Sequence, residues 1–217
     1  MNVVTPFFPS PSLAAAYIVA CFLLAATPGA DMALFLSRTL AGGRGQGFAA
    51  QAGANVGLVV HTFAAALGLS ALLAASAEAY EAVKIGGALY LLWLAWRAIR
   101  HGSVLKLTTG APARGGLRGA FANGLLINLT NPKIVLFFVT FLPQFIDAGD
   151  PHASAKLFAL GFGFIAITTI VNAAVILVAA RFVAAARANP RALRVFDYGF
   201  AALMSAFAVR LVWSEAR

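Results

Sequence analysis

Two stretches decide how this chain folds: Thr27-Pro28-Gly29-Ala30-Asp31 in the first half and Asn131-Pro132-Lys133 in the second. Each interrupts a long hydrophobic segment with a proline beside a polar and a charged residue. A proline within a helix removes one backbone hydrogen bond and clashes with the preceding turn. In lipid, the freed groups need partners in protein or in a water-filled cavity. Matched breaks in the two halves of a membrane chain indicate a transporter's binding site, so we expect the chemistry near Asp31 and Lys133.

The composition indicates an integral membrane protein. The 217 residues are 61% hydrophobic and only 11% charged, with a mean hydropathy of +0.87. Soluble domains carry about 25% charged residues. The net charge of +9 could serve nucleic acid, but the basic residues lie in short loops between apolar runs, where they are typical topology signals. We therefore expect one domain over residues 1–217, a lipid bilayer around it, and no nucleic-acid partner.

The apolar runs predict six spanning helices, because a span needs about 20 apolar residues. They cover 12–40, 46–74, 82–99, 118–146, 156–180 and 193–213. The first is broken at Pro28 and the fourth at Pro132, and the third and sixth are short. The order broken, long, short thus occurs twice, in repeat one (about 12–99) and repeat two (about 118–213), joined by the turn-rich linker 101–117. Three spans is an odd number, so we expect repeat two to be inverted, a recurring plan of transporters.

Lysine and arginine are distributed unevenly between the loops. Loops one, three and five hold 11 of them, whereas the termini and loops two and four hold 4. Because short cytoplasmic loops carry the excess of positive charge, we expect loops one, three and five in the cytoplasm and both termini on the outer side. Trp93 and Trp96 beside Arg97 fit an aromatic anchor at the cytoplasmic interface. If the first segment split at Pro28 without spanning, the N-terminal orientation would be reversed.

Asp31 is the acidic residue of the first break. An ionisable side chain at membrane depth is costly, so it usually has a partner and often a function. As a purely structural residue, Asp31 would cap the free amides of the half-helix that begins near Met32. As a functional residue, it would be the counter-ion of a substrate amine or a proton-carrying site. The sequence favours a function, with capping alone as the alternative.

Lys133 takes the corresponding place in the second break. It could bind a substrate carboxylate, pair with Asp31, or extend its ammonium group to the membrane surface. The half-helix after Pro132 also offers unpaired amides to an anion, and Asn131 is a natural turn and cap residue. The sequence leaves open whether Asp31 and Lys133 touch.

Four amide side chains accompany the two breaks. Gln51 and Asn55 lie four residues apart in the second span, and Asn123 and Asn128 are their counterparts in the fourth. Residues four apart share one face of a helix. Each could either line a polar cavity or make a hydrogen bond to a neighbouring helix, and the sequence does not separate these roles.

Other features of the spans are expected to be structural. Gly53 and Gly57 form a small-residue stripe that allows close helix packing. His61 and Asn172 are single polar residues in apolar surroundings, which are more often satisfied by a neighbour than used to relay protons.

The motifs of enzymes and metal sites are absent from the sequence. It has no nucleophile elbow, phosphate-binding loop or metalloprotease motif, so we expect no enzyme activity, no cofactor and no built-in ATPase. Cys21 is the one cysteine, which excludes an intrachain disulfide and a cysteine-based metal cluster. The three histidines, His61, His101 and His152, make no ligand spacing, so we expect no metal site.

At these motifs the chain resembles the LysE/RhtB family of bacterial amino-acid exporters. The resemblance covers most of residues 12–146 and runs through these stretches in order: Ala26-Thr-Pro-Gly-Ala-Asp31, Gly42-Gly-Arg-Gly-Gln-Gly47, Gly53-Ala-Asn-Val-Gly57, 84–96, 121–133 and 138–145. One departure is Ala30, where the family commonly has a second proline, so the break is softer here. The resemblance implies a multi-pass exporter of amino acids or related metabolites in the bacterial inner membrane, driven by the proton-motive force. It fixes neither the substrate nor the oligomeric state, and a homo-oligomer remains open.

Together these expectations describe a six-helix secondary exporter. An amino acid would bind near the membrane midplane, its ammonium group toward Asp31 and its carboxylate toward Lys133 or the half-helix amides. Protonation of Asp31 from the outside would weaken ammonium binding and favour release there. The candidate residues for substrate binding or proton coupling are Thr27, Pro28, Gly29, Asp31, Gln51, Asn55, Asn128, Asn131, Pro132 and Lys133.

Two rival functions fit the sequence less well. A metal-ion exporter of related architecture is weaker, because the spans hold one acid, one histidine and one cysteine, and divalent cations want more carboxylate or soft ligands. A non-transporting membrane scaffold fits the glycine stripe but does not explain charged residues inside the spans.

Overall fold

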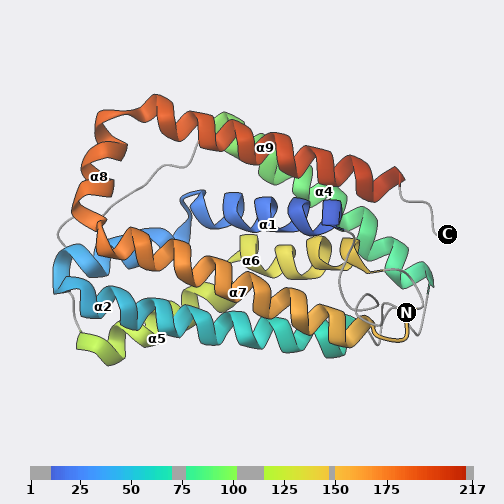
Figure 1. Ribbon diagram of the computed structural model, residues 1–217, viewed down its shortest axis with the longest axis horizontal. Helices are drawn as coiled ribbons and strands as arrows, with labels where there is room; N and C mark the ends of the chain where they lie inside the picture. Colours follow the sequence, from blue (N-terminus) through green and yellow to red (C-terminus); the bar gives the residue numbers. More distant parts are fainter. Residues whose placement is uncertain (1–10, 70–76, 102–114, 147–149, 214–217) are drawn as a thin grey trace.

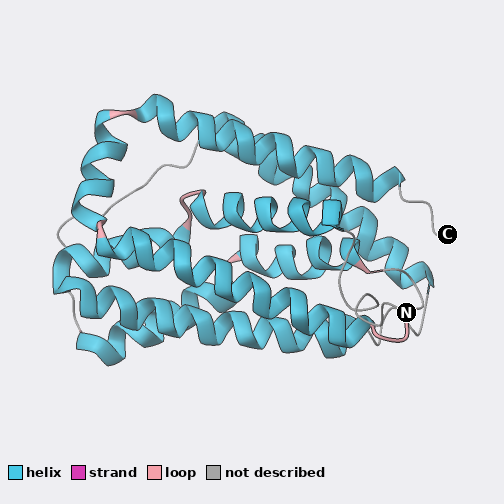
Figure 2. Cartoon of the chain, in the orientation of Figure 1, coloured by secondary structure: helices cyan, strands magenta, loops and turns pink. Residues whose placement is uncertain are grey.

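The computed structural model describes residues 11–69, 77–101, 115–146 and 150–213, and its regular structure in these ranges is helical (Figures 1 and 2). This confirms the all-helical class. The helices are α1 (Pro11–Ala26), α2 (Ala30–Phe63), η1 (Ala64–Leu69), α4 (Ala77–His101), α5 (Gly116–Thr130), α6 (Pro132–Leu136), η2 (Phe137–Phe141), η3 (Leu142–Phe145), α7 (Ala153–Leu177), α8 (Ala179–Ala188) and α9 (Pro190–Trp213). Most of the expected linker 101–117 lies outside the described residues.

Helices α1 and α2 are separated by three non-helical residues, Thr27 to Gly29. Helix α2 then runs to one end of the bundle, turns at Gly43 and returns beside itself (Figure 1). Gly43 has φ 79°, a left-handed conformation that glycine adopts without the steric cost of a Cβ atom. Across this turn, Arg38 donates a hydrogen bond to Oε1 of Gln46 over 3.4 Å.

A second interruption lies between α5 and α6, at Asn131. The two helical segments Gly116–Thr130 and Pro132–Phe145 meet at a bend of 50° and together are apolar enough to form one span. By length and composition, two further helical stretches of the described chain can cross a membrane: Ala30–Gly68, which includes the Gly43 turn, and Ala153–Leu177.

The outer surface of the bundle carries large apolar side chains. Ile170 is 71% exposed and Leu126 60% exposed, and many other aliphatic and aromatic residues are open in the same way. Extensive exposed apolar surface marks contact with a membrane or with another protein. Because helices of this bundle are long and apolar enough to cross a membrane, we expect the exposed side chains to face the bilayer.

Glycines bring α2 and α5 into close contact. A Cβ atom built on Gly53 would overlap the carbonyl oxygen of Phe121, and one built on Gly124 would overlap that of Ala50. Gly57 likewise leaves room for the side chain of Asn128. This confirms the packing role expected for the stripe of Gly53 and Gly57. These close contacts also hold the α2 segment after Gly43 against α5, which leads into the second interruption.

Aromatic side chains form much of the core around α6, η2 and α7. The rings of Phe137 and Phe164 lie 4.2 Å apart, and those of Phe137 and Phe141 4.8 Å apart. Phe138 packs edge-to-face on Phe164 at 5.8 Å and stacks with the His61 ring at 5.6 Å. These rings pack beside the second interruption, at Asn131.

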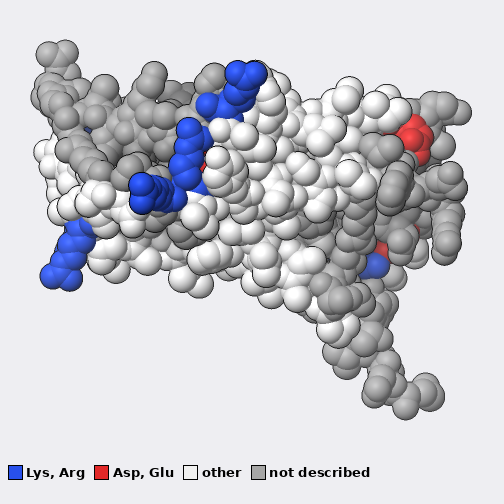
Figure 3. Space-filling model, turned by 90° about the horizontal axis from the view of Figure 1, so that it is seen from above, with Lys and Arg blue, Asp and Glu red and all other residues white. Residues whose placement is uncertain are grey.

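Basic and acidic side chains separate along the bundle. On the face shown in Figure 3, most of the visible lysine and arginine side chains lie over the left half, and the larger acidic patch lies toward the right end, where one basic side chain is also visible. The Gly43 turn, the start of α5 and α8 lie together at the left end in Figure 1. Arg44, Arg118 and Arg181 belong to these three elements.

We expect Gly53→Ala to destabilise the fold, because its methyl group can be accommodated only if α2 and α5 move apart. Overpacking of this kind costs about 1–3 kcal/mol. Gly86 in α4 is the control, since a Cβ atom there meets nothing within 4 Å. Gly86→Ala should raise stability by up to about 1 kcal/mol through helix propensity. Thermal unfolding midpoints in detergent compare the two variants, and equal midpoints would contradict the close packing of α2 on α5.

Candidate functional site

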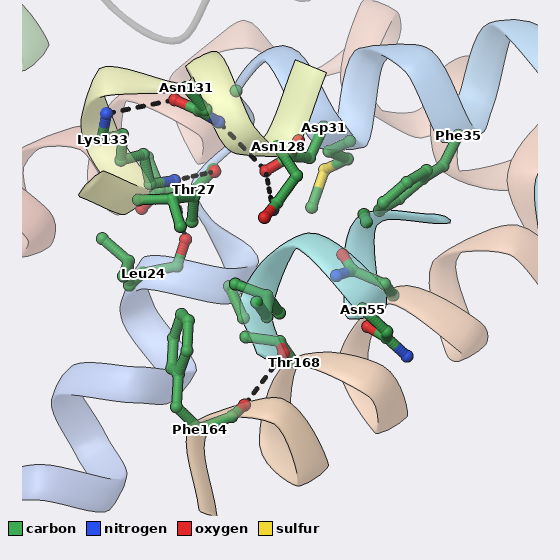
Figure 4. A pocket seen from close by; sticks show the side chains of 17 residues that line it. Leu24, Thr27, Asp31, Phe35, Asn55, Asn128, Asn131, Lys133, Phe164 and Thr168 are labelled. Carbon is green, nitrogen blue, oxygen red and sulfur yellow. Dashed lines mark hydrogen bonds between the residues drawn. The ribbon is translucent and has the colours of Figure 1, made fainter. Parts of the chain in front are cut away.

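The two interruptions meet in the interior around a small cavity of about 40 Å³ (Figure 4). At roughly 10–15 Å³ for each water position, this space holds about three water molecules. Its wall is formed by Leu24, Ala25, Thr27, Gly29, Asp31, Met32, Phe35, Ala54, Asn55, Leu58, Asn128, Asn131, Lys133, Ile134, Phe164, Thr168 and Asn172. Both halves of the chain contribute, so the site depends on their packing.

Asp31, in the first turn of α2, is held by two amides from the second interruption. Asn131 donates from Nδ2 to Oδ2 of Asp31 over 3.0 Å, and Asn128 donates to the same oxygen over 3.3 Å. The other carboxylate oxygen, Oδ1, is buried without a hydrogen-bond partner. Asp31 therefore presents an open acceptor, and capping of its own helix does not occupy the side chain fully.

Lys133 closes the end of α1. Because Pro28 has no N–H, the carbonyl of Leu24, four residues earlier, has no helical donor. The Lys133 ammonium donates to this carbonyl over 2.8 Å and to the carbonyl of Thr27 over 3.0 Å. It also lies 5.7 Å from the centre of the Phe200 ring, within the range of a cation–π contact.

Of the roles that the sequence left open for Lys133, the structure shows neither pairing with Asp31 nor an ammonium group extended to the membrane surface. The described side chains of Asp31 and Lys133 form no ion pair, because the ammonium points to backbone carbonyls of the other half of the chain. Lys133 donates hydrogen bonds to the carbonyls of Leu24 and Thr27 at the end of α1. The sequence left open whether Asp31 and Lys133 touch, and in the structure they do not.

The start of α6 is capped locally. The side chain of Asn131 accepts from the Lys133 amide over 3.1 Å, and its backbone carbonyl accepts from Ile134 and Val135, both over 3.0 Å. Pro132 has no amide hydrogen to offer. The first amides of α6 are therefore occupied, and this helix end offers no free donor to a substrate carboxylate.

His61 contacts a backbone carbonyl at the second interruption, as Lys133 does at the first. Pro132 leaves the carbonyl of Asn128 without its helical donor. The Asn131 amide approaches this oxygen over 3.1 Å, and Nε2 of His61 lies 3.4 Å from it, a hydrogen bond when that nitrogen carries the proton. The expectation that a neighbour satisfies His61 agrees with this contact.

Seven of the ten residues predicted from the sequence line the cavity: Thr27, Gly29, Asp31, Asn55, Asn128, Asn131 and Lys133. Pro28, Pro132 and Gln51 do not. Gln51 donates to the carbonyl of Thr169 over 2.7 Å, while Asn55 donates to its hydroxyl over 3.0 Å. Both amides thus bind α7, and Asn55 also faces the cavity.

Helix α7 contributes wall residues that the sequence did not single out. Phe164 and Thr168 line the cavity, together with Phe35 of α2. Asn172, which was expected to be structural, also lies in the wall. The sequence contained a clue to this face of α7, because Thr168 and Asn172 are polar residues four apart in an apolar helix and share one face.

The donor set does not make a metal site. No group of three histidine, cysteine, aspartate or glutamate residues that could hold a metal ion occurs in the described part of the chain. Asp31 has amide neighbours instead, which suit a hydrogen-bonded organic cation better than a bare divalent ion.

A buried carboxylate, amides and an ammonium group lie where two helices of an apolar bundle are interrupted, an arrangement typical of membrane transporters. The chain belongs to the LysE type translocator family, whose sequence model matches residues 22–215. It is accordingly a multi-pass membrane transporter and not an enzyme.

Curated relatives cover most of the chain. It is 31% identical over 190 residues to the homoserine/homoserine lactone efflux protein of Salmonella typhi. The aligned residues cover 87% of this chain and 90% of that protein. The Salmonella typhimurium protein of the same name is 30% identical over 190 residues, with the same coverage. An uncharacterized membrane protein of Vibrio cholerae is 33% identical over 156 residues, 72% of this chain and 75% of the relative. No solved structure matches.

We expect Lys133→Met to destabilise the protein, because the carbonyls of Leu24 and Thr27 would lose their donor. A buried acceptor left unpaired costs roughly 1–3 kcal/mol. Lys156→Met is the control, since Lys156 pairs with Asp150 in the turn before α7, and a pair near the surface contributes about 0–1 kcal/mol. Unfolding midpoints in detergent measure both, and a Lys133→Met midpoint no lower than that of the control would contradict the capping role.

Proposed function

We propose that this chain is a proton-coupled secondary exporter of amino acids or related small metabolites. The observation that carries the proposal is the open oxygen of Asp31 in a cavity built by both interruptions. A buried carboxylate with a free acceptor can hold either a protonated amine or a proton, but not both. This exclusive choice is what couples a substrate to a proton.

The curated relatives support the same substrate class. Two of them are named for the efflux of homoserine and homoserine lactone. Both compounds carry an amine, and a lactone has no free carboxylate. We therefore propose that the substrate is an amine-bearing metabolite about as large as homoserine or its lactone.

The coupling follows from the competition at Asp31. From the cytoplasm, the substrate ammonium binds the ionised carboxylate. Once the site opens outward, a proton replaces the ammonium group, and the neutral acid no longer attracts the cation. Returning with the proton resets the site, which gives net export at the expense of the proton gradient.

The architecture proposed for this cycle has six spans in two inverted repeats of three. Each half contains one interruption near a proline, and each interruption is contacted by a side chain of the other half, Lys133 at the first and His61 at the second. Rocking of one repeat against the other would break and remake these contacts around the site.

For the orientation, we propose that the basic end lies in the cytoplasm. Arg44, Arg118 and Arg181 belong to elements at this end, and cytoplasmic loops carry the excess of positive charge. Both termini would then face outward from the bacterial inner membrane. Metal export and a scaffold role are the alternatives: the described residues hold too few ligands for a metal ion, and a scaffold role leaves the open acceptor of Asp31 unexplained.

Asp31→Asn should abolish efflux with the protein level intact, because a neutral amide neither attracts an ammonium group nor carries a proton. The loss of a hydrogen bond to a charged group costs roughly 1.5–3 kcal/mol, which lowers substrate affinity by about tenfold or more, and the loss of the proton site removes the remaining active efflux. The measurement is efflux from cells preloaded with labelled basic, neutral and hydroxylated amino acids.

Asp150→Asn is the matched control. Asp150 lies in the turn before α7, away from the cavity, where the hydrogen bond from Lys156 lowers the pKa of its carboxyl group. We expect efflux of the control to equal that of the wild type. Near-normal efflux by Asp31→Asn would contradict the coupling role.

A further inference from the structure

A second cavity lies at the basic end of the bundle, between the Gly43 turn of α2 and the junction of α7 with α8 (Figure 1). Its volume is about 510 Å³, within the roughly 300–1,000 Å³ of small-molecule sites. It shares no wall residue with the cavity at Asp31. Arg44 and Arg181 line it, and among the described residues of its wall none is acidic. The cavity is therefore positively charged, and the translocation site does not account for it.

Arg44 is held in place by the end of α7. This helix ends at Leu177, and Val178, with φ −110° and ψ 21°, separates it from α8. One N–H of the Arg44 guanidinium donates to the carbonyl of Leu177 over 2.9 Å. A guanidinium carries five N–H donors, so others remain for a ligand after this bond. The side chain is exposed, and the bond to Leu177 fixes it beside the cavity.

Arg181 lies in the first turn of α8, at a helix end that already has a partial positive charge. No side chain caps this end, and its first turn holds no acidic residue. The amide of Phe182 makes the first hydrogen bond of the helix, to the carbonyl of Val178, so the amides of residues 179–181 precede it. The helix dipole disfavours a cation here and favours an anion. An anion in the cavity would compensate both the dipole and Arg181.

Exposed aliphatic side chains share the cavity wall with the arginines. Leu40, Leu177 and Val178 are 43%, 48% and 47% exposed. Leu177 is also the last residue of Ala153–Leu177, a helix long and apolar enough to cross a membrane. The cavity therefore lies at the level where hydrocarbon gives way to headgroups. A soluble phosphate would satisfy the arginines but would leave the aliphatic side chains without a partner.

We infer that this cavity binds the headgroup of an anionic phospholipid. Arg44 and Arg181 hold the phosphate oxygens by the charge-assisted hydrogen bonds that guanidinium groups form with phosphate. An acyl chain lies along Leu40, Leu177 and Val178. An anionic headgroup is preferred because a zwitterionic lipid brings an ammonium group, for which the described wall holds no acidic partner. Basic pockets between spanning helices on the cytoplasmic side bind acidic lipids in this way. The inference does not depend on the substrate proposed above.

Native mass spectrometry of the purified, delipidated protein in detergent tests the inference. Dioleoyl phosphatidylglycerol, which is anionic, and dioleoyl phosphatidylethanolamine, which is zwitterionic, are titrated separately. Their acyl chains are identical, so a difference in affinity for the first bound lipid reports the headgroup. Glycerophosphate then competes with bound phosphatidylglycerol, which distinguishes a lipid from a soluble phosphate.

Arg181→Gln and Arg191→Gln form the matched pair of variants. Both arginines are exposed in the first turn of a helix at the basic end, Arg181 in α8 and Arg191 in α9, and of the two only Arg181 lines the cavity (Figure 1). Each change removes one positive charge. In the described part of the chain neither side chain makes a hydrogen bond or an ion pair, so we expect both variants to fold as the wild type does.

We expect the wild type to bind one phosphatidylglycerol about tenfold more tightly than phosphatidylethanolamine, since one charged hydrogen bond is worth about tenfold in affinity. Arg181→Gln should lose this preference, and Arg191→Gln should keep it. Binding of neither lipid, equal affinity for both, or an equal loss in the two variants would overturn the inference. Displacement of phosphatidylglycerol by an equal concentration of glycerophosphate would also overturn it, because the occupant would then be a soluble phosphate.

Discussion

Two backbone carbonyls, those of Leu24 and Asn128, set the constraint on which the rest of the structure depends. Each lies four residues before a proline and therefore lacks its helical donor. In an apolar bundle such a group needs a partner from elsewhere in the protein. The Lys133 ammonium of the opposite half supplies one for Leu24, whereas the Asn128 carbonyl accepts from the Asn131 amide over 3.1 Å and also lies 3.4 Å from Nε2 of His61 in the opposite half. The interruptions thus hold the halves together as well as weakening individual helices.

This constraint also explains why the acid and the base of the site act separately. Lys133 is occupied by α1, so Asp31 is balanced by neutral amides and keeps one oxygen open. A direct ion pair would have occupied that oxygen. The glycine contacts between α2 and α5 bring Asn128 close enough to share Asp31. Helix packing, backbone satisfaction and an open acceptor are therefore parts of one arrangement.

Features that depend on local chemistry could be predicted from the sequence. Composition and apolar run length predicted the helical membrane class, and Gly53 predicted a close helix contact. The gathering of Asp31, Asn128 and Asn131 could be anticipated because polar residues in apolar spans collect where they can pair. The partner of Lys133 could not, because a long flexible side chain reaches many acceptors and nothing nearby in sequence marks the Leu24 carbonyl. Phe164 was missed because a single aromatic residue in an apolar helix does not show which face meets the cavity, whereas Thr168 shares a helix face with Asn172 and could have been found.

The central claim is that Asp31 binds either the substrate amine or a proton. The most direct measurement is calorimetric titration of the purified protein with the exported amino acid at neutral and at acidic pH, in the wild type and in Asp31→Asn. Because protonation of Asp31 removes the charge that holds the ammonium group, we expect the wild-type affinity to fall on acidification and the variant to bind weakly at both pH values. Equal wild-type affinity at the two pH values, or wild-type affinity in the variant, would contradict the account.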